Sequence, residues 1–487
     1  MRPGGLFFAV RGERRDGHDF VADAFANGAR AALVARIPDN LVTAVDEGTV
    51  AVMDFRSRSR PEAGAPRPSP GSRQPLLLLV DEPVQALQGC AAWWRRRHRA
   101  RVLAVAGSVG KTTTKELLAN ILEQRFRVLR TAGNFNNELG LPITLLQLTP
   151  EHDKVALEIG ISHVGEMEAF AAVAGPDVAV ITRIAPEHME FLHDLDTVER
   201  EEGRLVEALP AQGLAVLNAD DERVARMARR TAARVVTYGE TPAAEVRATR
   251  VEGHGLDGLT FELHVGSPDQ VDDAGDGRPR QAAADQAGQR VGAASGDGHG
   301  LPVRLPLVGR HFVTAALAAA GAALQEGCSR DDVAAGLQRP LQARRLAPRT
   351  LGSRITLLDD SYNAGPDSAR AALDVLANVE GRRVAVLGDM LELGEFAPAA
   401  HREVGAYVPG RAHVLLTVGP LARETARAAR EAGLPPDRVI ECGTAKEAIS
   451  SVRHTLQAGD TILVKGSHGV RLETLVEALV QAFPATG

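Results

Sequence analysis

The stretch VAGSVGKTTTKEL, residues 105–117, decides the fold expected for this chain. The apolar segment VLAVA (102–106) predicts a buried strand, two glycines follow in a short turn, and KELLANIL (115–122) predicts a helix. This order of strand, turn and helix is typical of a phosphate-binding loop, because backbone N–H groups at the helix N-terminus can hold phosphate oxygens. The alternative is an ordinary glycine turn with a helix cap, and the lysine and threonines after the second glycine count against it.

The side chains of this loop predict a nucleotide site. Lys111 is expected to bridge the terminal phosphates, and the Thr112 hydroxyl is expected to reach Mg²⁺. The residues expected to bind the nucleotide here are Gly107, Ser108, Val109, Gly110, Lys111, Thr112 and Thr113. Val105 stands where the common loop G-x-x-x-x-G-K-S/T has its first glycine, so the loop departs from the common form.

The composition predicts a cytoplasmic protein of several domains. A chain of 487 residues is too long for one compact core, so roughly two to four domains are expected. A formal net charge of −6 gives no overall attraction to nucleic acid. Three widely spaced cysteines argue against a disulfide framework and a clustered zinc site. We find no apolar run near the roughly 20 residues of a membrane span and no signal peptide. A monomer is our default expectation.

Three α/β domains are expected along the chain. Residues 6–35 alternate as strand, helix and strand, which predicts a small N-terminal domain over residues 1–98. The segments around the phosphate loop predict a parallel, doubly wound sheet over residues 99–343, and the pattern restarts with a Rossmann-like rhythm over residues 344–487. Two low-complexity segments, at about residues 56–75 and 266–300, are expected to be disordered.

Polar residues follow two strands of the predicted central sheet. Glu158 ends the segment KVALE (154–158), and His188 comes just after the next strand. The carboxyl ends of strands in an open α/β sheet form its ligand-binding edge, so the two side chains are expected near the nucleotide, on the side of Mg²⁺. A solvated strand-end carboxylate and a structural histidine are the alternatives.

One carboxylate is predicted to point inward. In TVEREEGRLVEAL (197–209), Val198, Leu205, Val206 and Leu209 form an apolar stripe at helical spacing, and Glu202 falls on that stripe. A buried carboxylate needs a cation, a metal or water as partner. Alternatively, Glu202 sits at the edge of the stripe and reaches solvent.

Two further groups of polar residues are candidates for a binding site. Asn134, Asn136 and Asn137 crowd a glycine-containing loop, where a turn with a helix cap is the simpler explanation. In the last domain, LLDDSYNAGP (357–366), VAVLGDMLELGE (384–395) and ILVKGSHG (462–469) each place polar residues after a strand. Three adjacent strands with polar ends argue for a cleft that faces another domain.

Taken together, these motifs resemble the Mur ligases, and most closely the MurF type of that family. The resemblance covers nearly the whole chain apart from the two low-complexity segments. The segments that carry it are GSVGKTTTK (107–115), TAGNFNNELGLP (131–142), EIGISHVGEMEAF (158–170), PEHMEF (186–191), LNADDE (217–222), LLDDSYNAGP (357–366), VLGDMLELGE (386–395) and VKGS (464–467). The family has the shorter loop G-x-x-G-K-S/T-S/T, which accounts for Val105.

The resemblance implies an ATP-dependent, amide-bond-forming ligase of peptidoglycan precursor synthesis. ATP would phosphorylate the terminal carboxylate of UDP-N-acetylmuramoyl-tripeptide, and the amine of D-alanyl-D-alanine would attack the resulting acyl phosphate. It further implies one Mg²⁺ at Thr112 and Glu158 and a second near His188. The remaining residues that it implies are Arg345, Asp360 and Tyr362 at the nucleotide, and Asn134, Asn136, Asn137, Asn363 and Lys465 on the substrate side.

Three departures from the family pattern stand out. Glu202 replaces the lysine that family members carry as a carbamate at the second Mg²⁺, and it is either a direct replacement or a relic. Phe312 and Ala315 stand where the family has asparagines near the adenine. The aspartate-serine-arginine segment that holds the UDP group in the family is missing before MRPGGLFF (1–8), so the N-terminal domain is expected to be truncated.

Three hypotheses for the function remain at this point. The first is an active ligase with Lys111, Glu158, His188 and Glu202 in the catalytic site. The second is a weakened paralogue that binds a nucleotide or UDP-sugar, as the three departures suggest. The third is a sister ligase with another amino-acid substrate, against which LGDMLELGE (387–395) counts.

Overall fold

The structure is a computed structural model that describes residues 3–12, 15–56, 74–266, 300–341, 346 and 348–484. Most of the two low-complexity segments, and Arg345, lie outside these residues. The chain divides into two compact units. The first comprises Met1–Arg99, Asn134–Pro150 and Ala172–Gly175, and the second comprises Ala100–Gly133, Glu151–Ala171 and Pro176–Gly487.

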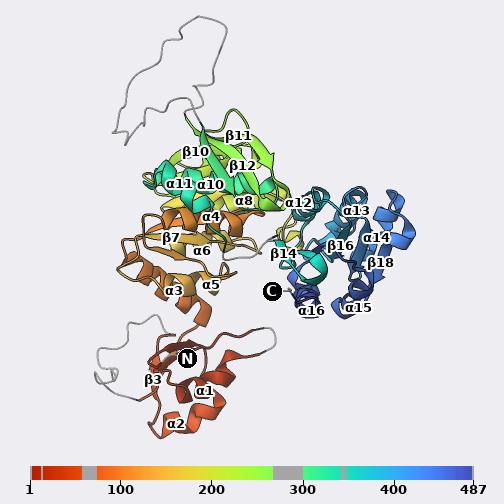
Figure 1. The fold of residues 1–487 in the computed structure, drawn as a ribbon. Helices are drawn as coiled ribbons and strands as arrows, with labels where there is room; N and C mark the ends of the chain where they lie inside the picture. Colours follow the sequence, from red (N-terminus) through yellow and green to blue (C-terminus); the bar gives the residue numbers. More distant parts are fainter. Residues whose placement is uncertain are drawn as a thin grey trace, which may run out of the picture. The chain divides into compact units, whose positions relative to one another are not determined.

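The first unit contains a parallel four-stranded sheet in the order β1-β2-β4-β3 (Figure 1). Its strands are β1 (Leu6–Phe8), β2 (Ala31–Val34), β3 (Ala51–Asp54) and β4 (Leu76–Leu79). Its helices are α1 (Val21–Ala26), α2 (Val42–Asp46), α3 (Pro83–Arg96) and α5 (Gly140–Leu145). The strand, helix and strand expected over residues 6–35 are confirmed, and they bury a small core that includes Val34 and Leu77.

The central sheet has nine strands in the order β13-β12-β11-β10-β9-β8-β5-β7-β6. Its strands are β5 (Arg101–Ala106), β6 (Val128–Arg130), β7 (Lys154–Glu158), β8 (Val178–Ile181), β9 (Leu214–Asn218), β10 (Arg234–Gly239), β11 (Val246–Gly253), β12 (Leu259–Val265) and β13 (Leu301–Leu305). The strands from β6 to β11 pair in parallel, whereas β12 and β13 are antiparallel. The doubly wound sheet predicted from the sequence is confirmed, and it carries an antiparallel extension.

The helices of the central sheet are α4 (Lys111–Leu122), α6 (Glu166–Ala174), α7 (Met189–Leu192), α8 (Leu195–Glu207), α9 (Glu222–Arg226), α10 (His311–Gln325) and α11 (Arg330–Leu337). Helices α4, α6, α7, α8 and α9 lie between its parallel strands, whereas α10 and α11 follow its last strand, β13. Helix α10 is rich in alanine and packs closely on α4 and on β9, β10 and β11 (Figure 1). Small side chains allow this close packing of α10 against the sheet.

The C-terminal sheet has six strands in the order β14-β15-β19-β16-β17-β18. Its strands are β14 (Pro348–Thr350), β15 (Thr356–Asp360), β16 (Arg383–Gly388), β17 (Val414–Val418), β18 (Val439–Cys442) and β19 (Thr461–Lys465). Its helices are α12 (Pro366–Ala377), α13 (Ala397–Tyr407), α14 (Ala422–Glu431), α15 (Ala445–Thr455) and α16 (Glu473–Ala482). All pairings except β14 with β15 are parallel, as the Rossmann-like rhythm predicts.

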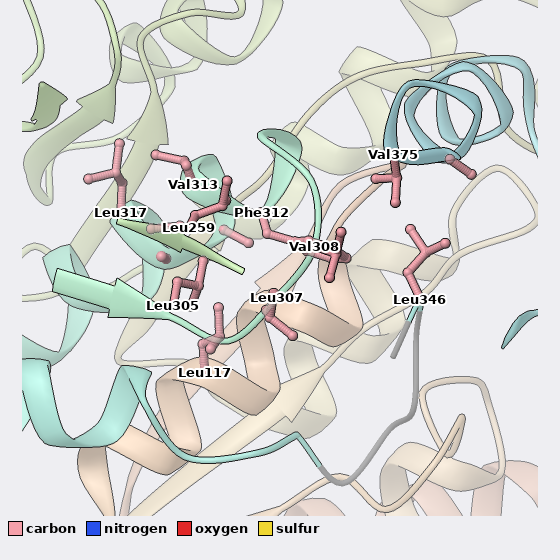
Figure 2. Packing of buried hydrophobic residues seen from close by; sticks show 14 of the residues in the cluster. Leu117, Leu259, Leu305, Leu307, Val308, Phe312, Val313, Leu317, Leu346 and Val375 are labelled. Atoms are coloured by element: carbon pink, nitrogen blue, oxygen red, sulfur yellow. The ribbon is translucent and has the colours of Figure 1, made fainter. Parts of the chain in front are cut away.

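A large hydrophobic cluster runs through the second unit (Figure 2). Leu117 of α4 and Phe312 and Leu317 of α10 belong to it, together with Val375 of α12. The periodic apolar face of each helix accounts for this burial. Among the helices that the structure describes, none is long and apolar enough to cross a membrane.

Candidate active site

The phosphate loop lies at the point where the central sheet changes its winding direction. From β5 the chain continues through α4 to β6 on one side, and from β8 it continues through α7 and α8 to β9 on the other. Because β5 and β8 are neighbours, the loops that follow them diverge and leave a ligand-binding crevice. Near the strand ends, the two loops are hydrogen-bonded to each other. The Ser108 N–H donates to the Arg183 carbonyl at 2.7 Å, and the Ala185 N–H donates to Ser108 Oγ at 3.0 Å.

Both glycines of the loop have left-handed backbone conformations that favour glycine. Gly107 has a φ of 113°, and Gly110, which caps α4, has a φ of 92°. A Cβ on Gly107 would lie 2.4 Å from Thr182 Oγ1, whereas a Cβ on Gly110 would meet Thr182 Cβ at 3.9 Å. The sequence pattern of the loop therefore reflects its backbone geometry and its close approach to β8.

Lys111 is held at the loop by a carboxylate that the sequence reasoning missed. Its Nζ lies 2.9 Å from Glu187 Oε2 and donates to the Ser108 carbonyl at 3.1 Å. Burial lowers the pKa of Lys111, but the carboxylates of Glu187, Glu202 and Glu158 outweigh it and raise the pKa above its usual value. Lys111 is therefore a stable cation at the end of the loop. Glu187 adjoins His188 after β8, so the strand-end argument used for His188 applied to it equally.

Thr112 and Glu158 meet, as the sequence predicts. Thr112 is in the first turn of α4, and its hydroxyl donates to Glu158 Oε1 at 3.0 Å. Glu158 ends β7 and is buried, in register with Val105 of β5. The interpretation of Glu158 as a solvated strand-end carboxylate is wrong.

Glu202 points inward from α8 and is 1% exposed, so the prediction of a buried carboxylate is confirmed. Its Oε2 accepts a hydrogen bond from the Gly107 N–H at 2.9 Å, which brings the α8 carboxylate to the first glycine of the phosphate loop. Burial and the nearby Glu187 raise the pKa of Glu202 to about 7, against the opposing effects of Lys111, the Gly107 N–H and His188. Glu202 therefore changes charge near neutral pH.

His188 contacts a residue of the C-terminal sheet region. It has a left-handed conformation with a φ of 50°, and its Nδ1 lies 2.5 Å from Glu392 Oε2, while its Nε2 lies 3.6 Å from Glu187 Oε1. Burial lowers the pKa of His188, but the hydrogen bond to Glu392 and the charge of Glu187 outweigh it and raise the pKa. The two flanking carboxylates thus favour the protonated form of the His188 ring.

The three asparagines lie in the segment between β6 and α5. Asn137 Oδ1 accepts hydrogen bonds from the N–H groups of Gly140 at 2.9 Å and Leu139 at 3.3 Å, so Asn137 caps the start of α5. The Asn134 carbonyl accepts from the Asn136 N–H at 2.8 Å. A turn with a helix cap is present, and the role of the three residues toward a substrate stays a prediction.

The polar residues of the C-terminal sheet do gather at one edge, because β19 lies between β15 and β16. Asp360 Oδ2 lies 2.5 Å from Lys465 Nζ, which also donates to the Asn363 carbonyl at 3.0 Å. Tyr362 is 44% exposed in the following turn. Asp389 instead caps α14, with its Oδ1 accepting from the first N–H of that helix at 2.7 Å.

The positions that depart from the family asparagines are part of the core. Phe312 and Ala315 are buried in α10 within the large hydrophobic cluster, so apolar packing replaces the polar groups there. Arg345 lies outside the described residues.

The oxygen donors beside the loop fit a magnesium ion. A hydroxyl and a carboxylate, from Thr112 and Glu158, are ligands of the type that Mg²⁺ prefers, and it usually binds through one or two carboxylates together with substrate phosphates. Within the described ranges, no group of three or more His, Cys, Asp or Glu side chains lies close enough to hold a metal ion by itself.

Comparison with known proteins defines the class of this chain. Residues 105–323 match the Mur ligase middle domain, residues 344–468 match the Mur ligase glutamate ligase domain, and residues 1–60 match the Mur ligase family catalytic domain. Together with relatives that are similar over the full length, these matches show that the chain belongs to the Mur ligase family.

Within the family, the chain is similar throughout to the MurF type. It is 34% identical to UDP-N-acetylmuramoyl-tripeptide–D-alanyl-D-alanine ligase of Escherichia coli, over 98% of this chain and 91% of the relative. It is 30% identical to the enzyme of the same name from Bacillus subtilis, over 98% and 90%. The crystal structure of MurF from Acinetobacter baumannii superposes with a TM-score of 0.76 at 28% identity, over 98% of this chain and 91% of that one.

Proposed function

We propose that this chain is the ATP-dependent ligase that adds D-alanyl-D-alanine to UDP-N-acetylmuramoyl-tripeptide through an acyl phosphate, in peptidoglycan precursor synthesis. The single observation that carries the proposal is the loop at the switch point of the central sheet, where Lys111 pairs with Glu187 and Thr112 is hydrogen-bonded to Glu158. Similarity to MurF enzymes along 98% of the chain favours this function over a nucleotide-binding paralogue and over a sister ligase.

The chemistry of such a ligase depends on position and charge. Loop N–H groups and Lys111 would hold the ATP phosphates against the attacking carboxylate of the tripeptide. Glu187 holds the ammonium of Lys111 in place before a phosphate arrives. Bound Mg²⁺, held by Thr112 and Glu158, would neutralise charge on the phosphate oxygens.

Glu202 and His188 are proposed to serve the second metal position of the family. Glu202 supports this role because its buried side chain reaches the loop at Gly107, so a short side chain brings a carboxyl group to the phosphate site. His188 supports it less directly, since Glu392 and Glu187 flank its ring nitrogens.

The remaining residues are proposed for binding. Nucleotide contacts are assigned to Arg345, Asp360 and Tyr362, and substrate contacts are assigned to Asn134, Asn136, Asn137, Asn363 and Lys465. The Lys465–Asp360 pair supports the C-terminal part of this assignment, because it fixes two opposite charges at the sheet edge expected to bind ligands.

Phosphate release by the purified chain tests the function. Release should require ATP, Mg²⁺, UDP-N-acetylmuramoyl-tripeptide and D-alanyl-D-alanine together, and release without the dipeptide would contradict the ligase assignment. Thr112→Val should lower the rate by about 100-fold, whereas Thr112→Ser keeps the hydroxyl and should lose little. For Glu202, full activity of Glu202→Ala would rule out a metal role, and Glu202→Lys tests whether the residue of the family can replace it.

A further inference from the structure

Lys115 is a fully buried lysine, 0% exposed, that the catalytic assignment leaves unused. It lies one turn after Lys111 on α4, and its Nζ donates to the Thr131 carbonyl at 2.8 Å and pairs with the Glu116 carboxylate. A buried ammonium costs several kcal/mol unless it is paired and hydrogen-bonded, so a lysine at this position needs a specific network. Because it is fully buried, Lys115 does not extend toward solvent.

Besides these two partners, the Lys115 ammonium lies near the proposed metal-binding carboxylate. Lys115 Nζ lies 4.0 Å from Glu158 Oε2, and the Thr112 hydroxyl donates to Glu158 Oε1 at 3.0 Å. Two residues three positions apart on one helix therefore contact the two oxygens of a single carboxylate. Thr112 donates a hydrogen bond to Oε1, and the charge of Lys115 lies at ion-pair distance from Oε2.

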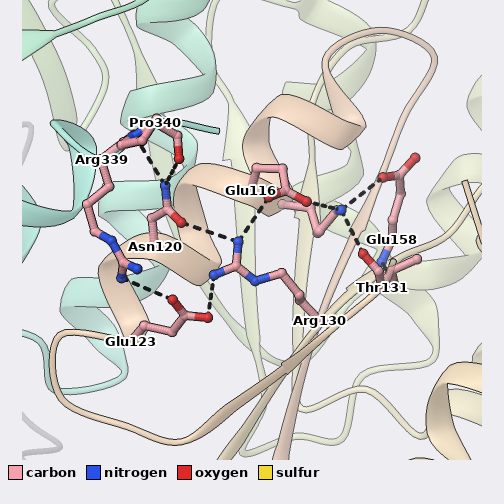
Figure 3. A network of polar contacts seen from close by, with 9 residues as sticks. Glu116, Asn120, Glu123, Arg130, Thr131, Glu158, Arg339 and Pro340 are labelled. Carbon is pink, nitrogen blue, oxygen red and sulfur yellow. Dashed lines mark hydrogen bonds and ion pairs between the residues drawn. The ribbon is translucent and has the colours of Figure 1, made fainter. Parts of the chain in front are cut away.

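Thr131 ties the lysine and the carboxylate together. Its carbonyl accepts from Lys115 Nζ, and its hydroxyl accepts from the Glu158 N–H at 2.9 Å. Both the backbone and the side chain of Glu158 are thus held by the same small group of residues on α4 and after β6 (Figure 3).

A second layer of charges holds the lysine in place. Glu116, which pairs with Lys115, also accepts from Arg130 Nη1 at 2.9 Å. Arg130 in turn contacts Asn120 Oδ1 at 3.2 Å and the Glu123 carboxylate. Paired in this way, the Lys115 ammonium is fixed at one point rather than free to move toward another partner.

We propose that Lys115 is a positioning residue for the metal: it holds the Glu158 carboxylate so that Oε1 faces Thr112 and the phosphate loop. The inference rests on the proposed role of Glu158 as a Mg²⁺ ligand. Groups that orient a metal ligand typically change metal affinity about 10- to 100-fold when they are removed. Lys115→Met should therefore weaken metal binding by that factor, with ADP binding in the absence of metal retained.

The test is the affinity of the full-length chain for Mn²⁺ in the presence of ADP, measured from the electron paramagnetic resonance signal of free Mn²⁺. Lys154→Met is the matched control. Lys154 is also a buried lysine paired with a glutamate, Glu326, but it begins strand β7, whereas Glu158 ends that strand. It should leave the Mn²⁺ affinity unchanged. Lys115→Arg, which keeps the charge, should recover most of the affinity lost in Lys115→Met.

Equal Mn²⁺ affinity of Lys115→Met and the unmodified chain, or an equal loss in Lys154→Met, would overturn the proposal. Circular dichroism checks that each variant is folded, and if Lys115→Met does not fold, Lys115→Gln decides the question because its amide can still donate to the Thr131 carbonyl. Glu158→Gln separates the two levels of the hypothesis. If both Glu158→Gln and Lys115→Met keep the Mn²⁺ affinity of the unmodified chain, the proposed metal site is wrong. If Glu158→Gln abolishes the affinity and Lys115→Met does not change it, only the proposed role of Lys115 is wrong.

Discussion

Replacing Glu202 by glutamine is expected to change how the free energy of unfolding depends on pH. Glu202 is 1% exposed, and burial raises its pKa from 4.5 to about 7 in the folded chain. The folded state therefore binds a proton at this site more tightly than the unfolded state does. A raised carboxyl pKa contributes stability that is present in full below pH 4.5 and is lost as the pH rises to about 7.

The size of the effect follows from the two pKa values. A pKa of about 7 in place of 4.5 corresponds to about 3 kcal/mol, at roughly 1.4 kcal/mol for each pH unit. Glutamine keeps an oxygen that can accept from the Gly107 N–H but it cannot ionise. As the pH rises from about 4.5 to about 8, the stability of Glu202→Gln relative to the unmodified chain should therefore increase by about 3 kcal/mol in total.

Urea unfolding of both proteins, followed by circular dichroism without nucleotide or metal, measures this difference at several pH values. Glu207→Gln is the control, since Glu207 is on the same helix with a side chain that is 48% exposed. A difference between Glu202→Gln and the unmodified chain that is the same at low and high pH would refute the reasoning.

Two further predictions concern the neighbours of this site. Glu392→Gln should lower the pKa of His188, because it removes a carboxylate that raises this pKa while burial still lowers it. An unchanged NMR titration of the His188 imidazole would contradict this. Gly107→Ala should destabilise the chain by about 2–5 kcal/mol, because alanine is strained in the left-handed backbone conformation and its Cβ would lie 2.4 Å from Thr182 Oγ1. Gly110→Ala should destabilise the chain by only about 1–2 kcal/mol, because it introduces the backbone strain without a close Cβ contact. Equal losses in urea unfolding of the two variants would exclude the steric contact.

Sequence reasoning found the members of the site that a local pattern marks. Glycine spacing placed Lys111 and Thr112, the position at a strand end placed Glu158, and helical periodicity placed Glu202 inside. Glu187 went unnoticed although it carries the same strand-end signal as His188. The partnership of His188 with Glu392 has no local signal, because the two residues are far apart in the chain and meet only through tertiary structure.

By itself, the sequence determined the α/β class, the phosphate loop with its helix, the inward direction of Glu202 and the similarity to the Mur ligases. These follow from spacing along the chain, since side-chain direction within one strand or helix is fixed by its period. Only the tertiary structure decided which distant charges share a site. It brought Glu202 to the Gly107 N–H and Lys115 to Glu158, because strand order and helix packing, rather than sequence separation, set the distances between charges.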